Sequence, residues 1–481
     1  MHRNGKWWPL AAVCLGNLML LIDVTIVVTA LPDIARELDA GLTAQQWVLD
    51  AYALALAALL LALGAAGDRY GRRRVYLVGL TGFAISSLVC GLAPGPELLV
   101  AARAVQGVAG AAMFASNAPL LAATYGGRDR GVAFGVWGAV NGAASALGVL
   151  LGGVLTQYLD WRYIFLVNLP ISAFAIWLTW RTVGESRNPA GGRIDWWGTA
   201  AFTGSAAALV YGLIRGGEYG WSDALSVASL VSAGLALAAF VAIERAVVRR
   251  GRGLPVLDLG LLRRPSFAAL MTAAALLTGA AFAHYTYTML WLQYALGLSP
   301  VRAGLAVLPM AATVFVVAAA GGRLLDRLPP RLPISVGVLL IGVGLLLQTA
   351  VSPDSAWTVL LPGLTVTGVG VGVAVPVLVS AALAAAPQER SGMASGALNT
   401  FRQLGFALGV AVLGTLFTAG GPPRTLADFA DALDRIYLTA GLAAVFAAAL
   451  VALLVREPAT RRAAGPPTPT ERQRVPTGGG R

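Results

Sequence analysis

The sequence predicts an all-α polytopic membrane protein with fourteen membrane-spanning helices. Its 481 residues are 57% hydrophobic and only 12% charged, whereas soluble globular domains carry about 25% charged residues. Runs of roughly 20 apolar residues, the length that crosses a bilayer, follow one another along nearly the whole chain. In such a protein a net charge of +12 has a topological explanation. We therefore expect the lipid bilayer, and no nucleic acid, as a partner.

Fourteen apolar runs define the expected helices. We place them at residues 8–31, 46–67, 75–93, 97–125, 132–155, 163–181, 195–214, 224–247, 267–295, 303–325, 332–351, 357–384, 393–418 and 433–455. The first run is too long for the core of a signal peptide, so we expect it to be retained. Residues 461–481 are rich in Pro, Gly and Arg without periodicity, which predicts a disordered cytoplasmic tail.

The distribution of basic residues predicts the orientation. With both termini in the cytoplasm, 27 of the 35 Lys and Arg residues fall on cytoplasmic segments, 6 on outer loops and 2 within helices. Short cytoplasmic loops are enriched in Lys and Arg, so we predict cytoplasmic N- and C-termini. Arginine greatly outnumbers lysine, a bias typical of a high-GC genome. We expect a multi-pass protein of a bacterial cytoplasmic (inner) membrane.

Composition also excludes several chemistries. Lys6 is the only lysine, so the chain has no Walker A sequence with which to use ATP. His2, His284, Cys14 and Cys90 are far apart in the sequence and offer no metal-ligand spacing. We expect no enzymatic activity, no metal site and no organic cofactor.

A charged connector occurs twice. Between the second and third runs it contains Gly64, Asp68, Arg69, Gly71 and Arg72, and Gly322, Asp326 and Arg327 repeat part of it later. So many charges cannot lie in hydrocarbon, and each copy joins the second and third helix of a six-helix set. The repeat predicts a 6+2+6 organisation: a bundle at 1–185, a two-helix insertion at 186–254 and a bundle at 255–460. We interpret the connectors as a conformational gate on the cytoplasmic side; the alternative is a solvated topogenic loop.

Several motifs occur in a fixed order along these helices. Asp23 lies in a first-helix motif that ends at Pro32, and Arg103 precedes Gln106 on the fourth helix. The fifth helix carries the glycines of an antiporter motif: Gly148, Gly152 and Gly153. Residues 161–170 and 391–403 form two further signatures. Together with the connector at 64–74, these motifs resemble the major facilitator superfamily, in particular its fourteen-helix drug:proton antiporters of the QacA/EmrB type.

The resemblance implies the major facilitator fold and a function. That function is proton-coupled efflux (antiport) of drugs or other amphipathic organic compounds, cationic ones included, by alternating access. Alternatives are an exporter of an endogenous antibiotic or metabolite and a proton-driven importer, and sodium in place of protons is a further one. A membrane sensor or scaffold has little support, because no soluble domain exists to transmit a signal.

Asp23 and Arg103 are the principal candidates for proton coupling. An ionisable residue at the centre of a spanning helix costs roughly 2.5–3.5 kcal/mol. Helix rise places Asp23 about 12 Å and Arg103 about 9 Å below the outer surface, so the two can pair. A changing separation would switch the carboxyl between proton uptake and release; the alternative is a static ion pair. Asp50, near the outer end of the second helix, is either a second protonation site or a residue that faces outer water.

The other polar residues within helices are candidates for a substrate cavity. Gln106 and Asn117 share a stripe with Arg103 on the fourth helix, which indicates either a water-filled cavity or hydrogen bonds to neighbouring helices. On the ninth helix, regular α-geometry would place an aromatic set on one face, suited to stacking and cation–π contact with a ligand: His284, Tyr287, Trp291 and Tyr294.

A final polar group lies on the thirteenth helix. Asn399, Arg402 and Gln403 are spaced at i, i+3 and i+4, so their side chains lie close together on the helix surface. Arg402 is roughly 14 Å from the cytoplasmic end by helix rise and therefore needs an acidic, carbonyl or aqueous partner.

Overall fold

The computed structural model describes residues 6–187, 195–250, 257–325, 328–386 and 391–455. The gate residues Asp326 and Arg327, like the tail predicted at 461–481, lie outside the described residues.

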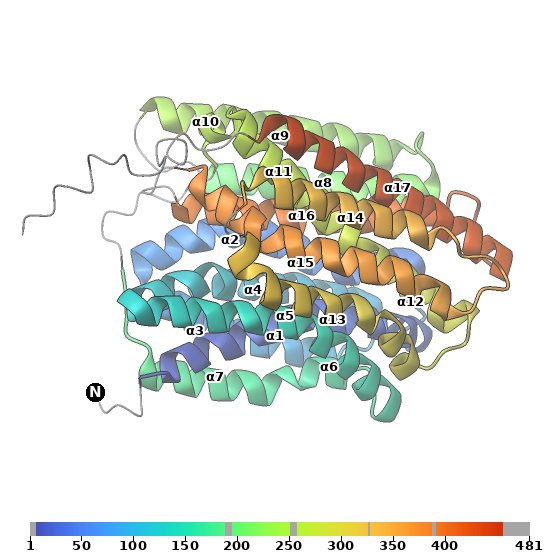
Figure 1. Ribbon diagram of the computed structural model, residues 1–481, viewed down its shortest axis with the longest axis horizontal. Helices are drawn as coiled ribbons and strands as arrows, with labels where there is room; N and C mark the ends of the chain where they lie inside the picture. Colours follow the sequence, from blue (N-terminus) through green and yellow to red (C-terminus); the bar gives the residue numbers. More distant parts are fainter. Residues whose placement is uncertain (1–5, 188–194, 251–256, 326–327, 387–390, 456–481) are drawn as a thin grey trace, which may run out of the picture.

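The first half of the chain forms helices α1 (Trp8–Glu37), α2 (Leu42–Tyr70), α3 (Arg72–Gly91), α4 (Pro96–Thr124), α5 (Gly127–Tyr158), α6 (Tyr163–Leu166), α7 (Asn168–Thr182), α8 (Trp196–Tyr219) and α9 (Ala224–Arg250). The second half forms α10 (Leu259–Leu262), α11 (Pro265–Thr278), the π-helical turn η2 (Gly279–Ala283), α12 (His284–Leu290), the π-helical turn η3 (Trp291–Ala295), α13 (Pro300–Leu325), α14 (Arg331–Gln348), the 3₁₀ turn η4 (Trp357–Leu360), α15 (Leu361–Ala384), α16 (Ser391–Phe417) and α17 (Leu426–Leu454). The long helices run roughly parallel to one another (Figure 1).

Within the described chain, thirteen helical segments are long and apolar enough to cross a membrane, judged by length and composition. Helix α5, 32 residues long, adds the shorter apolar stretch Leu147–Tyr158 where the sequence predicts a further span. The described ranges contain no β-strand, and the prediction of an all-helical membrane protein is confirmed.

Two expected spans are interrupted for identifiable reasons. The span predicted at 163–181 is divided into α6 and α7, because Pro170 has no N–H to donate to the carbonyl of Leu166 and so interrupts the helix. The span predicted at 267–295 runs through α11, η2, α12 and η3. Its π-helical turns rotate the side chains that follow relative to a regular α-helix.

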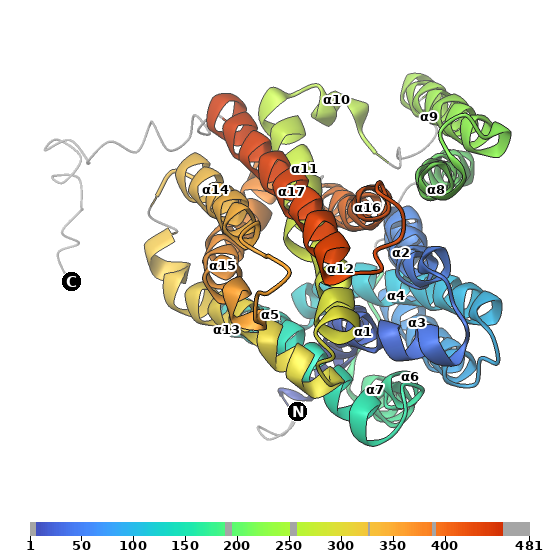
Figure 2. The ribbon, with the colours of Figure 1, turned by 90° about the vertical axis from the view of Figure 1, so that its right-hand side faces the viewer.

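The helices form two sets with the α8–α9 hairpin at one side. In the first set α1 packs on α5 and α2 on α4; in the second set α14 packs on α15 and α17. The sets meet along two seams, α5 against α13 and α2 against α16. Figure 2 views the molecule along its helices and shows α8 beside α2 and α16, with α9 packed on the outer side of α8. The insertion therefore lies at the α2–α16 seam.

The distribution of basic residues predicts which end of the molecule faces outward, and we call it the outer end. Two hydrogen bonds join the two helix sets at this end. Gln293 Nε2 donates to the carbonyl of Thr29 at 2.9 Å, and the Tyr294 hydroxyl donates to that of Pro32 at 2.9 Å. Toward the opposite end of α5, no described atom lies within 4 Å of where a Cβ on Gly135 would stand. The described chain is thus closed at the outer end, while α5 is free of contacts at Gly135.

Candidate functional site

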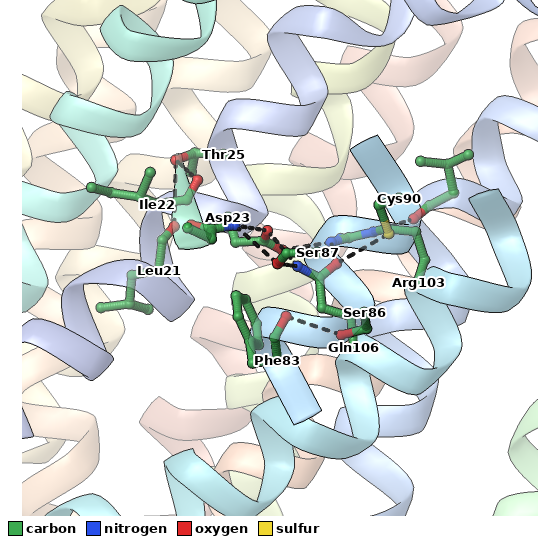
Figure 3. Close-up of polar contacts among 12 residues, drawn as sticks. Leu21, Ile22, Asp23, Thr25, Phe83, Ser86, Ser87, Cys90, Arg103 and Gln106 are labelled. Carbon is green, nitrogen blue, oxygen red and sulfur yellow. Dashed lines mark hydrogen bonds and ion pairs between the residues drawn. The ribbon is translucent and has the colours of Figure 1, made fainter. Parts of the chain in front are cut away.

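A buried ion pair forms the centre of the candidate site (Figure 3). An Nη1 hydrogen of Arg103 on α4 is donated to Oδ2 of Asp23 on α1, with the nitrogen and oxygen 2.5 Å apart. The side chain of Asp23 is 0% exposed and that of Arg103 only 1%. The ion pair between Asp23 and Arg103, which their predicted depths in the membrane allowed, is therefore present. Since a buried charge without a partner is very unfavourable, each residue fixes the other.

Two side-chain amides also donate to the Asp23 carboxylate, and a hydroxyl links these amides to each other. Gln106 Nε2 donates to Asp23 Oδ1 at 2.9 Å, and Asn168 Nδ2 on α7 donates to the same oxygen at 3.2 Å. Both amides also donate to the hydroxyl of Ser87 on α3, at 2.9 and 3.3 Å. All these residues are buried, so four helices of the first set contribute to one closed polar network.

The Arg103 guanidinium is held on its remaining sides as well. Its Nε donates to the carbonyl of Val48 on α2 at 3.0 Å, and a further hydrogen goes to Gln106 Oε1 at 2.6 Å. The ring of Tyr52 lies 4.2 Å from the guanidinium carbon, in the range of a cation–π contact. A planar cation with this many fixed donors and a stacked ring has one favoured orientation.

Sequence reasoning found part of this network. Asp23, Arg103 and Gln106 were identified as candidates, but Ser87 and Asn168 were not. Asn168 lies inside the signature at 161–170, and that motif was the available signal. Ser87 carries no such signal, because serine is ordinary in a spanning helix and only packing brings its hydroxyl to the amides of Gln106 and Asn168.

The stripe on α4 faces α1 and not an open cavity. Asn117 Nδ2 donates to Asn17 Oδ1 on α1 at 3.1 Å, and both Gln106 and Asn117 are buried. Of the two interpretations of this stripe, hydrogen bonding to neighbouring helices describes this conformation. The expectation of a water-filled cavity along α4 is corrected accordingly.

Asp50 is fully buried on α2, so the interpretation that it faces outer water is wrong. Its side chain is 0% exposed, and neither carboxyl oxygen has a hydrogen-bond partner in the described chain. One turn earlier, Gln46 Nε2 donates to the Tyr287 hydroxyl of α12 at 3.0 Å, and that hydroxyl donates to the carbonyl of Val410 on α16 at 2.5 Å. Asp50 therefore lies beside a hydrogen-bonded contact between the two helix sets.

The aromatic residues of the ninth span do not share a single face. The His284 ring lies 5.7 Å from that of Tyr437 on α17, whereas Tyr287 reaches α2 and α16. Tyr294 reaches α1, and Trp291 is buried at the start of η3. His284 and Tyr287 lie on the regular helix α12, where an offset of three residues separates their directions by about 60°, and the two side chains reach different helices. The π-helical turn Trp291–Ala295 changes the periodicity before Tyr294.

Arg402 lies on the side of α16 that faces the interior. Thr415, on the opposite side of α16 by helix geometry, donates its hydroxyl to the carbonyl of Leu213 on α8. Asn399 and Gln403 flank Arg402, and all three side chains are only partly buried. Within the described residues Arg402 forms no ion pair, and its Nε has no acceptor. The acidic or carbonyl partner expected for Arg402 is thus not found there.

The glycines of the fifth-helix motif divide between two contacts. A Cβ on Gly148 would lie 1.9 Å from Thr25 Oγ1, and one on Gly152 would lie 2.8 Å from the carbonyl oxygen of Ile26, both on α1. A Cβ on Gly153 would lie 2.8 Å from the carbonyl oxygen of Pro300 at the start of α13. Gly148 and Gly152 thus allow close packing within the first set, whereas Gly153 lies on the seam between the sets.

The first charged connector makes its described contacts within the first set. Arg72 pairs with Asp68 at 2.8 Å, and the Arg73 backbone N–H donates to Glu185 Oε1 at 3.1 Å. Gly71 has φ 114°, a conformation that favours glycine, and a Cβ there would lie 2.6 Å from the Glu185 carboxyl carbon. Sequence reasoning missed Glu185, which joins the chain after α7 to the start of α3.

Comparison with known proteins identifies the family. Residues 13–410 match the family model described as Major Facilitator Superfamily. This chain belongs to the major facilitator superfamily. It is therefore a membrane transporter, and thirteen candidate spans make it a multi-pass protein of the cell membrane. Mycobacterium and Streptomyces relatives agree with a bacterial membrane.

Several relatives cover most of the chain. It is 37% identical to the puromycin resistance protein pur8 of Streptomyces alboniger over 428 residues, covering 88% of this chain and 84% of the relative. It is 35% identical to the multidrug resistance protein Stp of Mycobacterium tuberculosis (strain CDC 1551 / Oshkosh) over 411 residues, 85% and 75% of the two chains. The methylenomycin A resistance protein of Bacillus subtilis (strain 168) is 35% identical over 454 residues, 93% and 94% of the two chains.

Solved structures agree on the fold alone. The human organic anion transporter MFSD10 superposes with a TM-score of 0.64 at 18% identity, over 93% of this chain and 99% of that one. A peptide transporter, POT, in complex with sulfate superposes with a TM-score of 0.68 at 15% identity, over 92% and 93%.

Proposed function

We propose that this transporter exports drugs or other amphipathic organic compounds in exchange for protons. It would be a fourteen-helix antiporter of the QacA/EmrB type, with both termini in the cytoplasm. Its six-helix bundles would be residues 1–185 and 255–460, joined by a two-helix insertion at 186–254. The proton gradient would supply the energy, without a cofactor.

The buried network around Asp23 is the observation that carries this proposal. A carboxylate inside the first bundle is paired with Arg103 and accepts hydrogen bonds from two amides. In general, a guanidinium in contact with a buried carboxyl favours its charged form, whereas burial without such a partner favours the neutral acid. A helix movement that separates α1 from α4 is therefore a proton-binding step, and their return is a proton-releasing step.

Alternating access gives this step a direction. In the outer-closed state Asp23 is ionised and the carrier accepts substrate from the cytoplasm. Opening at the outer end releases the substrate, and Asp23 takes up a proton there. Closure at the outer end and opening inward then return the proton to the cytoplasm and restore the pair with Arg103.

The substrate cavity would lie between the bundles, lined by partly buried side chains of α16 and by α12. Asn399, Arg402 and Gln403 would line it from α16, and Tyr287 and Trp291 would line it from the ninth span. Gln106, Asn117 and His284 would support this cavity from the layer behind it. The connector at 64–74 and its second copy at 322–331 would act as the cytoplasmic gate.

Proteoliposomes with an imposed pH gradient test the proposal. Efflux of puromycin, chosen because a relative is named for resistance to it, would be measured for the parent, Asp23→Asn and Asp354→Asn. We expect Asp23→Asn to abolish pH-driven efflux. Asp354→Asn, which neutralises an exposed carboxylate on a loop, should behave like the parent. Full pH-driven efflux by Asp23→Asn would refute the role of the carboxylate.

If puromycin is not transported, the same design applies to any compound found in a resistance panel. That panel would use an efflux-deficient host with and without a protonophore. Resistance that the protonophore removes supports proton coupling, and resistance that survives it contradicts the proposal.

A second candidate is the export of an antibiotic that the same cell makes. Two relatives are named a probable actinorhodin transporter and a tetracenomycin C resistance and export protein, from Streptomyces coelicolor and Streptomyces glaucescens. A biosynthetic gene cluster beside the gene for this chain, with loss of product secretion on deletion, would favour this candidate.

A further inference from the structure

Asp50 has an environment unlike that of Asp23. It is fully buried on α2, and both of its carboxyl oxygens lack a hydrogen-bond partner in the described chain. An ionised carboxylate in such a place would be an uncompensated buried charge, which folded proteins avoid by neutralisation or pairing. In this conformation Asp50 is therefore accommodated as the neutral acid.

Helix geometry places Asp50 on the face of α2 that meets α16, at the seam between the two helix sets. On α2, the residues that meet α16 are Gln46, Ala57 and Leu61: Gln46 meets Gly414, the carbonyl of Ala57 accepts from Thr400, and Leu61 packs against Gly396. Asp50 follows Gln46 by one turn and shares this face. By the same antiparallel register, it lies opposite Ala407 and Ala411 on α16, both fully buried.

Among the described residues, Asp50 takes part in no ion pair. The stretch of α16 from 406 to 417 contains no ionisable residue. The nearby ionisable groups are Tyr287 of α12, Tyr211 of α8 against Trp47, and Arg103 of α4. Arg103 is engaged by Asp23 of α1. A negative charge on Asp50 would therefore be stabilised only if the seam opened to water.

We propose that Asp50 is a proton-operated latch of the α2–α16 seam. With Asp50 protonated, the carboxyl packs against the alanines of α16 and the outer end closes. With Asp50 ionised, the charge requires water and the outer end opens. The latch rests on the proposed proton-coupled cycle, because it would prevent the empty carrier from closing at the outer end before a proton has been bound.

Distance measurements between two spin labels test the latch directly. Gly41→Cys and Pro422→Cys place labels on exposed loops before α2 and α17. The native buried cysteines are replaced by Cys14→Ala and Cys90→Ser. Pulsed electron paramagnetic resonance in lipid nanodiscs would compare pH 5.5 with pH 8.5. Asp23 takes up a proton in the outer-open state of the proposed cycle, so it opposes the latch in this parent. In the Asp23→Asn variant, the ratio of outer-open to outer-closed molecules should rise with pH, by up to about tenfold per pH unit for one proton.

Four variants of this parent separate the latch from the proposed function. Asp50→Asn and Asp50→Ala should not open further as the pH rises, and Asp50→Ala serves as the second variant in case an amide at this buried position prevents folding. Asp23→Asn removes the opposing proton of Asp23 and should show the full pH-dependent distance change, and Asp354→Asn should match the parent. An Asp23→Asn variant without a rise of the outer-open fraction with pH, or an Asp50→Asn variant with such a rise, would overturn the latch.

The transport assay then distinguishes the two ideas. If Asp50→Asn opens further as the pH rises while Asp23→Asn loses pH-driven efflux, the latch fails and the proposed function stands. If Asp50→Asn and Asp50→Ala do not open further as the pH rises while Asp23→Asn transports normally, the latch stands and the Asp23 mechanism fails.

Discussion

A methyl group added at Gly153 should hinder closure of the outer end. This glycine lies on α5 where the helix meets the start of α13, and an added Cβ would lie 2.8 Å from the Pro300 carbonyl oxygen and 3.0 Å from the Val301 Cα. Both neighbours are backbone atoms, so no side-chain rotation relieves the contact. Ordinary contacts begin at 3.4 Å, and α5 and α13 would have to separate by roughly half an ångström.

The energetic consequence falls on one state of the carrier. Overpacking of this kind typically costs about 1–3 kcal/mol, and we expect opening of the outer end to separate these two helix ends and relieve the contact. A bias of that size changes a two-state equilibrium about 5- to 150-fold. We therefore expect Gly153→Ala to favour the outer-open state and to reduce the rate of pH-driven efflux by a comparable factor.

Two alanine variants on the same helix provide matched controls. No described atom lies within 4 Å of a Cβ on Gly135, so Gly135→Ala should leave efflux unchanged. Gly148→Ala clashes with Thr25 within the first set and should lower the thermal stability instead. Efflux and the unfolding temperature would be measured for all three variants. Equal efflux by Gly153→Ala and Gly135→Ala would refute the reasoning.

Two further predictions follow from the charged groups. Arg103→Gln leaves the Asp23 carboxylate buried without its counter-charge and should destabilise the protein by about 3–5 kcal/mol, measured by reversible unfolding in detergent. The double variant with Asp23→Asn should recover most of that stability without recovering efflux; restored efflux would contradict the proposed proton-binding role. Asp68→Asn should slow efflux more than Asp326→Asn, because the first connector has three consecutive arginines where the second has two prolines. Equal initial rates for these two variants would count against the asymmetry.

The polar residues show how far sequence reasoning reaches into a membrane protein. Asp23 and Arg103 were predictable as a pair because a charge within an apolar run is costly and helix rise gives its depth. The face of the ninth span was not predictable, since π-helical turns change the side-chain periodicity without an obvious signal in the sequence. The stripe on α4 was visible, but whether it faced water or α1 depended on packing.

The amino-acid sequence was enough to predict the all-helical membrane class, the approximate spans, the repeat of the charged connector and the resemblance to the major facilitator superfamily. These follow from composition, periodicity and local motifs, which act over a few turns of chain. Helix packing decided that Ser87 and Asn168 join the hydrogen-bond network of Asp23, that Asp50 is buried without a hydrogen-bond partner in the described chain and that Gly153 lies against the backbone of α13. Each of these arrangements depends on residues far apart in the chain, so the local sequence does not reveal it.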